Sequence, residues 1–104
     1  MSHTGNLYVP KRYWQDPNET KRYRWNFSAW CTVAGTSLVS ADILLPSGSP
    51  LEIVGSVVVG SNIVTAYIRG LVSGAQYTVT CRATTAEATP QVLDRSIILI
   101  ARDF

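Results

Sequence analysis

From residue 22 onward, apolar and polar side chains alternate with the period of two that is typical of β-strands. Extended stretches are expected at residues 24–34, 37–45, 51–59, 63–70, 76–85 and 95–102. In the first stretch the alternation places Trp25, Phe27, Ala29, Cys31 and Val33 on the inward face. Trp30 falls on the outward face. No segment shows an apolar stripe at helical spacing, so the pattern predicts strands throughout.

Short gaps rich in Gly, Pro, Ser and Asn separate these stretches. Turns are expected at Gly35, at residues 46–50, at residues 60–62 and at residues 73–74. This gives six strands, or seven if part of residues 6–14 also pairs. Turn signals at such spacing predict an all-β chain folded as a single antiparallel β-sandwich.

One local motif narrows the type of sandwich. The stretch GLVSGAQYTVTCRATT (70–85) resembles the corner between strands E and F of immunoglobulin-like and fibronectin type III domains, with Leu71, Gly74 and Tyr77 at the matching places. The resemblance implies that the Tyr77 ring packs in the core while its hydroxyl bonds nearby backbone. Tyr77 precedes Cys81 by four residues, which matches the fibronectin version better. We therefore expect an immunoglobulin-like or fibronectin-III-like sandwich.

The N-terminal part has a different character. Residues 1–20 lack strand alternation and contain Pro10 and Pro17, so they are expected to form an extended arm that precedes a sandwich domain at residues 21–104. Charge is concentrated at this end: residues 1–25 carry a net charge of +3 within a chain of net charge +2. The basic character therefore belongs to the arm and the start of the domain.

The rings of the arm, Tyr8, Tyr13 and Trp14, allow two interpretations. The arm either folds back over the edge of its own sheet, or docks on another subunit with the rings as anchors and the cations as steering charges. The expected partner-contacting residues are Tyr8, Lys11, Arg12, Tyr13, Trp14, Lys21, Arg22 and Arg24. Aromatic and basic residues together also suggest nucleic acid, but Trp25 and Phe27 alternate as in a core strand, so a nucleic-acid partner is not expected.

The two cysteines, Cys31 and Cys81, fall on inward faces of two predicted strands. They are expected to be reduced and to act as small core hydrophobes, because no tryptophan lies between them and no signal segment directs the chain to an oxidising compartment. A disulfide formed late, after cell lysis, is the alternative. The residues expected to build the core structurally are Trp25, Phe27, Cys31, Tyr77 and Cys81.

Catalytic chemistry finds no support in the sequence. The chain has one histidine, His3, so neither a metal site nor a Ser–His or Cys–His pair is expected. The carboxylates do not pair on one face, and phosphate-binding glycine motifs are missing. We expect a protein that is not an enzyme and needs no cofactor or metal. The N-terminus lacks an apolar run, so synthesis in the cytoplasm without membrane insertion is expected.

Several stretches together resemble a group of small virion-associated proteins of tailed bacteriophages. The matching residues are Asp16-Pro17, Tyr23, Asn26 to Trp30, Gly74, Tyr77, Val79, Thr80, Thr84, Thr85, Arg95, Ser96, Ile97 and Leu99. The match spans most of residues 16–102. It departs from the group where Cys31 replaces a leucine and where residues 86–94 replace a Gly-Arg pair.

This resemblance implies an immunoglobulin-like virion structural protein that works by binding. The implied partners are capsid or head–tail proteins, with the chain as a decoration or cement protein, or an accessory at the head–tail junction, assembled as a trimer or ring. The alternative is a tail-fibre or host-surface adhesion module. In that case Trp30, Asn62 and Tyr67 would form an exposed platform.

Overall fold

The computed structural model describes residues 11–102; residues 1–10 and 103–104 lie outside the described part. The elements in chain order are β1 (Lys11–Gln15), β2 (Lys21–Asn26), α1 (Ser28–Ala34), β3 (Leu38–Leu44), β4 (Glu52–Gly60), β5 (Ile63–Arg69), β6 (Gln76–Thr85) and β7 (Val92–Ala101). The expectation of an all-β chain is confirmed, with one short helix as an exception.

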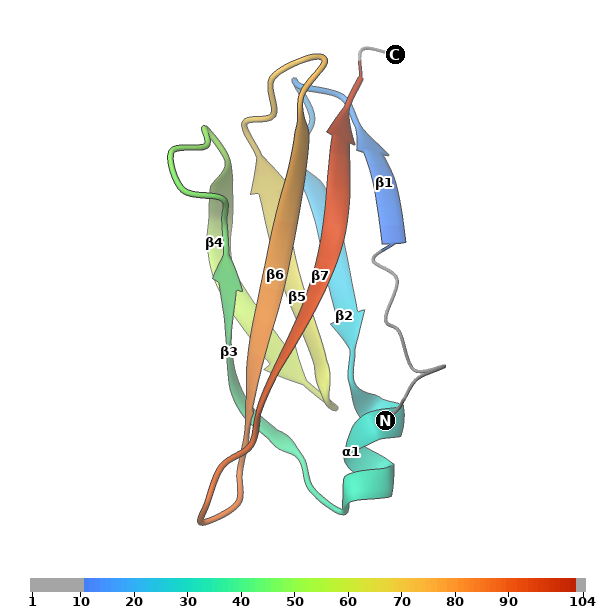
Figure 1. The fold of residues 1–104 in the computed structure, drawn as a ribbon, viewed down its shortest axis with the longest axis vertical. Helices are drawn as coiled ribbons and strands as arrows, with labels where there is room; N and C mark the ends of the chain where they lie inside the picture. Colours follow the sequence, from blue (N-terminus) through green and yellow to red (C-terminus); the bar gives the residue numbers. More distant parts are fainter. Residues whose placement is uncertain (1–10, 103–104) are drawn as a thin grey trace, which may run out of the picture.

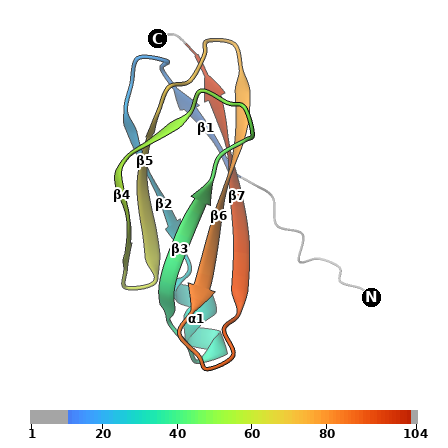
Figure 2. The ribbon, with the colours of Figure 1, turned by 90° about the vertical axis from the view of Figure 1, so that its left-hand side faces the viewer.

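The strands form two sheets that face each other as a sandwich (Figures 1 and 2). One sheet has the order β1-β7-β6-β3 and the other the order β2-β5-β4. The orders β3-β6-β7 and β2-β5-β4 correspond to strands C-F-G and B-E-D of an immunoglobulin sandwich. β1 is added at the outer edge of β7.

The expectation of an antiparallel sandwich is confirmed for β2 to β7, and only the strand at this outer edge, which comes from the predicted arm, pairs in parallel among the described residues. β1 runs parallel to β7, with Lys11 opposite Ile97 and Gln15 opposite Ala101, whereas the other paired strands are antiparallel. The turn after β1 sends the chain into β2 in the opposite sheet, so β1 and β2 do not pair with each other. Part of the predicted arm is therefore an edge strand, as in the interpretation in which the arm covers its own sheet.

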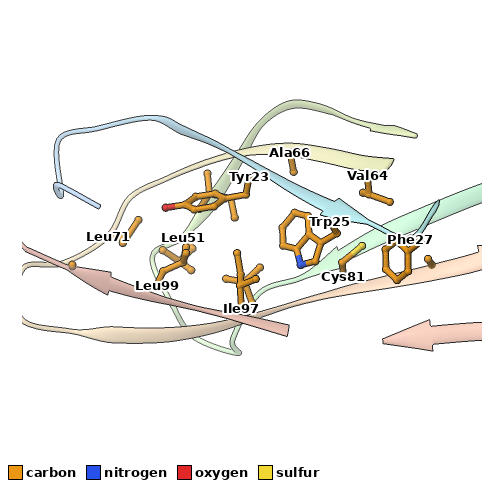
Figure 3. Close-up of a cluster of buried hydrophobic side chains, with 14 of the residues drawn as sticks. Tyr23, Trp25, Phe27, Leu51, Val64, Ala66, Leu71, Cys81, Ile97 and Leu99 are labelled. Atoms are coloured by element: carbon orange, nitrogen blue, oxygen red, sulfur yellow. The ribbon is translucent and has the colours of Figure 1, made fainter. Parts of the chain in front are cut away.

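The core lies between the two sheets and is filled by alternate residues of both (Figure 3). The buried core side chains are Tyr23, Trp25, Phe27, Cys31, Leu51, Val64, Ala66, Ile68, Leu71, Val79, Cys81, Ala83, Ile97, Leu99 and Ala101. Burial of this apolar surface is the main force that holds the sheets together. The two sheets thus present their outward faces and their edges to other molecules.

The predicted strand over residues 24–34 is wrong beyond Asn26. The Asn26 Oδ1 accepts hydrogen bonds from the backbone N and the Oγ of Ser28, which turns the chain out of the strand. α1 then begins at Ser28 and ends at Gly35, which has a left-handed φ of 71°. Alternation misled here because Phe27 and Cys31, four residues apart, share a face in a helix as well as in a strand.

The helix changes the surroundings of three predicted positions. Trp30 was expected to point outward from a strand, but it is half-buried and packs against the core. Ala29 and Val33 were expected on the inward face, but Ala29 is exposed and Val33 is 90% exposed. Cys31 is buried, although it reaches the core from the helix.

Two turns fix the ends of the sandwich. Ser61 and Asn62 have φ values of 53° and 62° between β4 and β5, as a two-residue hairpin turn requires. The Asn62 carbonyl accepts a hydrogen bond from the Phe27 N, and its side-chain oxygen accepts one from the Leu38 N. This turn therefore holds both ends of the segment that contains α1.

The tyrosine corner forms at the opposite end of the sandwich. The Tyr77 hydroxyl accepts a hydrogen bond from the Val72 N at 3.2 Å, five residues upstream. The ring packs against the core cluster. This geometry is the one that the sequence motif around Leu71 and Gly74 predicts for the corner between strands E and F.

Candidate protein-interaction surface

The edge strands β1 and β2, which belong to different sheets, lie next to each other along one side of the sandwich. The rings of Tyr13 and Tyr23 meet edge to face, with centroids 5.4 Å apart. The Lys21 Nζ donates a hydrogen bond to the Trp14 carbonyl oxygen at 3.0 Å. These contacts bring the sequence positions 11–15 and 21–25 together as one surface.

A buried glutamine fastens β1 to the rest of the domain. Gln15 is fully buried, and its Nε2 donates to the carbonyl oxygens of Glu19 and Ile68 at 2.9 and 2.8 Å. Its Oε1 accepts a 2.6 Å hydrogen bond from the Tyr23 hydroxyl. Burial and the nearby Glu19 charge raise the Tyr23 pKa, so the hydroxyl stays protonated and keeps donating at neutral pH. Every polar atom of the Gln15 side chain is thereby engaged.

Replacing this glutamine is expected to destabilise the whole edge. In Gln15→Leu the Tyr23 hydroxyl and the Ile68 carbonyl lose their buried partner, so the free energy of unfolding should fall by about 3 kcal/mol. Urea denaturation followed by tryptophan fluorescence measures the change. The control is Gln76→Leu on the exposed face of β6, which should change stability by less than about 0.5 kcal/mol. Equal stability of the two variants would contradict the proposed role of Gln15.

Cationic side chains gather on this side of the molecule. The chain has nine Lys and Arg residues. Two of them form ion pairs elsewhere, Arg69 with Glu52 and Arg82 with Asp94. The remaining residues lie on or beside β1 and β2 and are called here the basic edge: Lys11, Arg12, Lys21, Arg22, Arg24, Arg95 and Arg102.

The last two members of the basic edge could not be assigned to it from the sequence. Arg102 follows β7, and its guanidinium lies 4.2 Å from the centre of the Trp14 ring. Arg95 reaches from β7 toward β2: its guanidinium lies 5.0 Å from the Phe27 ring, and its Nη1 donates to the Asn26 carbonyl at 3.5 Å. The parallel pairing of β1 with β7 brings Arg102 beside Trp14, and the packing of β7 across from the end of β2 brings Arg95 beside Asn26 and Phe27.

The carboxylates nearest in sequence, those of Asp16 and Glu19, make hydrogen bonds within the turn between β1 and β2. The Asp16 Oδ1 accepts from the Asn18 N at 2.8 Å, and the Glu19 Oε1 accepts from the Asp16 N at 3.2 Å. Both groups therefore shape the turn between β1 and β2. The basic edge remains suited to an acidic partner.

The predicted aromatic anchors have different environments. Tyr13 is half-buried, packs against the core and contacts Tyr23, so most of its ring already serves the fold. Trp14 is 44% exposed and carries Arg102 on its ring. Tyr8 lies outside the described residues. Trp14 is thus the exposed ring that this edge offers to a partner.

The outward face of the β2-β5-β4 sheet contains a shallow hollow beside the basic edge. The hollow has a volume of about 310 Å³ and is lined by Arg22, Arg24, Val58, Gly60, Ser61, Ile63 and Thr65. Arg22 and Arg24 alternate outward on β2, which places them about 7 Å apart along the strand. Two arginines beside the apolar side chains of Val58 and Ile63 suit an acidic protein segment.

The other predicted residues have structural positions. Trp25, Phe27, Cys31 and Cys81 are buried in the core, and the two cysteines are free thiols. Burial, followed by the charges of Asp94 and Asp42, raises the Cys81 pKa to about 12, so this thiol is not a nucleophile at neutral pH.

The residues of the predicted adhesion platform do not come together. Asn62 lies in the β4–β5 turn, whereas Tyr67 lies on β5 opposite Arg22. About 13 Å of extended strand separates Ile63 from Tyr67. Trp30, moreover, is half-buried on α1. A platform of these two rings and one amide is therefore not formed.

Residues 11–102 were also searched for other kinds of site. Among them, no group of three His, Cys, Asp or Glu side chains converges as a metal site would require. No helix in the described part of the chain is long and apolar enough to span a bilayer.

Comparison with known families decides the class of protein. The model of the family described as "Podophage GP4 fiber-tail adaptor protein gp77" matches residues 15–100. The chain belongs to this family. The match covers the sandwich from the end of β1 almost to the end of β7. No curated protein and no solved structure matches the chain significantly.

Membership of the fiber-tail adaptor family supports the coarser part of the sequence-based interpretation. The chain is a virion structural protein of a tailed phage, as the resemblance implied. The description of the family refers to fiber and tail, so the more specific prediction of capsid decoration or cement finds no support in it.

Proposed function

We propose that this protein is a non-enzymatic adaptor that joins a tail fibre to the tail of a podophage particle and binds one of these partners through its basic edge. The name of the family suggests the two partners. One observation supports this choice of surface. Cationic side chains from three different strands, β1, β2 and β7, lie together on one side of the sandwich as the basic edge.

The mechanism is rigid docking between preformed surfaces. The basic edge steers the domain toward an acidic face of the partner and disfavours wrong partners of like charge. Trp14 supplies a large ring that is already held in place by Arg102. Rings that are ordered before binding lose little entropy on association, which favours their use as anchors. The hydrogen bonds of Gln15 keep β1 attached to the domain when force is transmitted between fibre and tail.

A tail-side adaptor fits the chain better than the two other roles considered. A capsid decoration protein would have the same sandwich but finds no support in the family. A host-surface adhesin would need a ligand platform, and Trp30, Asn62 and Tyr67 do not form one. The adaptor role uses the surface that the fold does build.

A complementation experiment tests the proposed function. Particles from a mutant of the encoding phage that lacks this gene are expected to hold DNA and a tail but to lack fibres. Adding the purified protein and then the fibre protein should restore fibres, counted by electron microscopy, together with infectivity.

Two results would contradict the proposal. In the first, the mutant particles carry their normal fibres but their capsids break at lower temperature, which would indicate decoration. In the second, the purified protein binds host cells by itself and does not bind the particles, which would indicate adhesion.

A further inference from the structure

A small cleft opens between β1 and β2 at the side of the sandwich. It has a volume of about 160 Å³ and is lined by Lys11, Tyr13, Arg24, Trp25, Asn26, Arg95 and Ile97; these residues are called here the side cleft. Trp25 and Ile97 are buried and form its inner end. Lys11 and Arg24 are exposed and stand at its rim.

One of the two side chains at the inner end of the side cleft carries an unpaired polar atom. Trp25 is 4% exposed, and its buried indole Nε1 has no hydrogen-bond partner. Figure 3 shows the ring reaching inward from β2, with its nitrogen on the side that faces Ile97. Buried polar groups in native proteins are nearly always bonded, so an unpaired donor calls for an explanation. An acceptor supplied on binding would provide one.

The chemistry of the lining restricts what the acceptor is. The side chains of Trp25, Lys11, Arg24 and Arg95 carry only hydrogen-bond donors. The Asn26 acceptors are already engaged, its Oδ1 by Ser28 and its carbonyl by Arg95. The cleft therefore combines an unpaired donor with cations on both of its walls. The complement of such a lining is an anion with oxygen acceptors.

We propose that the side cleft receives a single carboxylate side chain, an Asp or Glu, from the chain that the adaptor binds. This inference rests on the proposed function and names the group on the partner that the basic edge recognises. The carboxylate accepts from the Trp25 indole N–H at the inner end and from Lys11 and Arg24 at the rim. Hydrogen bonds to an ionised acceptor are stronger than neutral ones, so this contact orients the partner as well as holding it.

The size of the cleft excludes larger anions. A volume of about 160 Å³ corresponds to roughly five water molecules, well below the several hundred Å³ of sites for drug-sized ligands. The cleft can therefore enclose a group of the size of one carboxylate side chain, but not a whole nucleotide or sugar acid.

The N-terminal segment of the chain itself cannot supply the carboxylate. The segment that precedes Lys11, MSHTGNLYVP, contains neither Asp nor Glu. The nearest carboxylates in sequence, those of Asp16 and Glu19, are bonded within the β1–β2 turn. The acidic residue is therefore expected on a separate partner chain.

The substitution Trp25→Phe tests the proposal, because it removes the donor and keeps an aromatic ring in the core. The thermal midpoint is expected to fall by several degrees, because the smaller ring leaves core volume unfilled and loss of the unpaired N–H offsets only part of that cost, so both readouts are taken well below the midpoint. The readouts are the affinity of the full-length protein for fibreless mutant particles and the protein concentration that gives half-maximal fibre restoration. If the side cleft binds the tail, the affinity for the particles should fall about tenfold. If it binds the fibre, the concentration for half-maximal fibre restoration should rise about tenfold.

A double-mutant cycle separates a shared carboxylate from a structural effect. If Trp25 and Lys11 bind the same group, Trp25→Phe combined with Lys11→Gln should lose less than the product of the two single losses. The charge control is Arg69→Gln, which removes a cation outside the basic edge and should leave both readouts unchanged.

The outcomes distinguish this inference from the proposed function. If the wild-type protein restores fibres and Trp25→Phe behaves identically in both readouts, the inference is wrong and the adaptor role stands. If Trp25→Phe and Lys11→Gln each weaken binding but their effects multiply independently, no common carboxylate exists and the inference is also wrong. If the wild-type protein does not restore fibres, the proposed function itself fails.

Discussion

Reversing the charges of Arg22 and Arg24 is expected to abolish fibre attachment without unfolding the protein. In Arg22→Glu/Arg24→Glu, carboxylates replace the two guanidinium groups that line the hollow on β2. Like charges placed opposite each other at an interface disfavour binding by several kcal/mol, which corresponds to more than about a hundredfold in affinity. Both side chains are exposed, so the free energy of unfolding should change by less than about 1 kcal/mol.

Matched neutral substitutions show whether position or total charge matters. Arg22→Gln/Arg24→Gln and Arg69→Gln/Arg82→Gln remove the same number of charges, the first pair on the basic edge and the second outside it. The first pair should weaken binding to the partner about tenfold or more and reduce its dependence on salt. Equal losses in the two pairs would show that net charge, rather than the basic edge, drives binding.

Replacing Gly70 by alanine is expected to give the largest loss of stability. Gly70 follows β5 with a φ of +94°, and a Cβ there would lie 2.5 Å from the Pro50 carbonyl oxygen. The substitution combines an unfavourable backbone conformation with a clash against backbone, so the free energy of unfolding should fall by about 3 kcal/mol or more. Chemical denaturation measures the loss, and failure to fold at room temperature would be its extreme form.

The control for Gly70 is another glycine with free space around it. A Cβ at Gly60, at the end of β4, would meet nothing within 4 Å, and this residue does not need a positive φ. Gly60→Ala should therefore change stability by less than about 1 kcal/mol. A Gly70→Ala variant as stable as Gly60→Ala would show that the corner between Pro50 and β5 relaxes at little cost.

Alternation of side chains was sufficient to predict most strands because these strands have one buried and one exposed face. β5 and β6, expected at residues 63–70 and 76–85, are observed as Ile63–Arg69 and Gln76–Thr85. The helix α1 was missed for a physical reason. Phe27, at its N-cap, and Cys31, within it, satisfy both periods, and the side-chain bonds of Asn26 favour the turn into the helix.

The candidate surface was predictable only in part. Lys11, Arg12, Lys21, Arg22 and Arg24 lie close in sequence, so their clustering was visible. Arg102 joins them through the parallel pairing of β1 with β7, and Arg95 through the packing of β7 across from the end of β2; no local pattern gives either arrangement.

Buried polar groups were the other feature that the sequence concealed. Gln15 reads as a surface residue of an arm, yet it is fully buried and holds three hydrogen bonds. The unpaired Trp25 nitrogen is likewise a property of the packing, not of the strand pattern. In both cases the position of a partner group, or the lack of one in the described residues, depends on tertiary structure.

Cryo-electron microscopy of the intact virion tests the central claim most directly. The account predicts density for this sandwich between the tail and the fibre, with the basic edge of β1 and β2 buried against a partner and Arg22, Arg24 and Trp14 in contact with it. Density for the domain on the capsid, or at the tail with the basic edge facing solvent, would contradict the account.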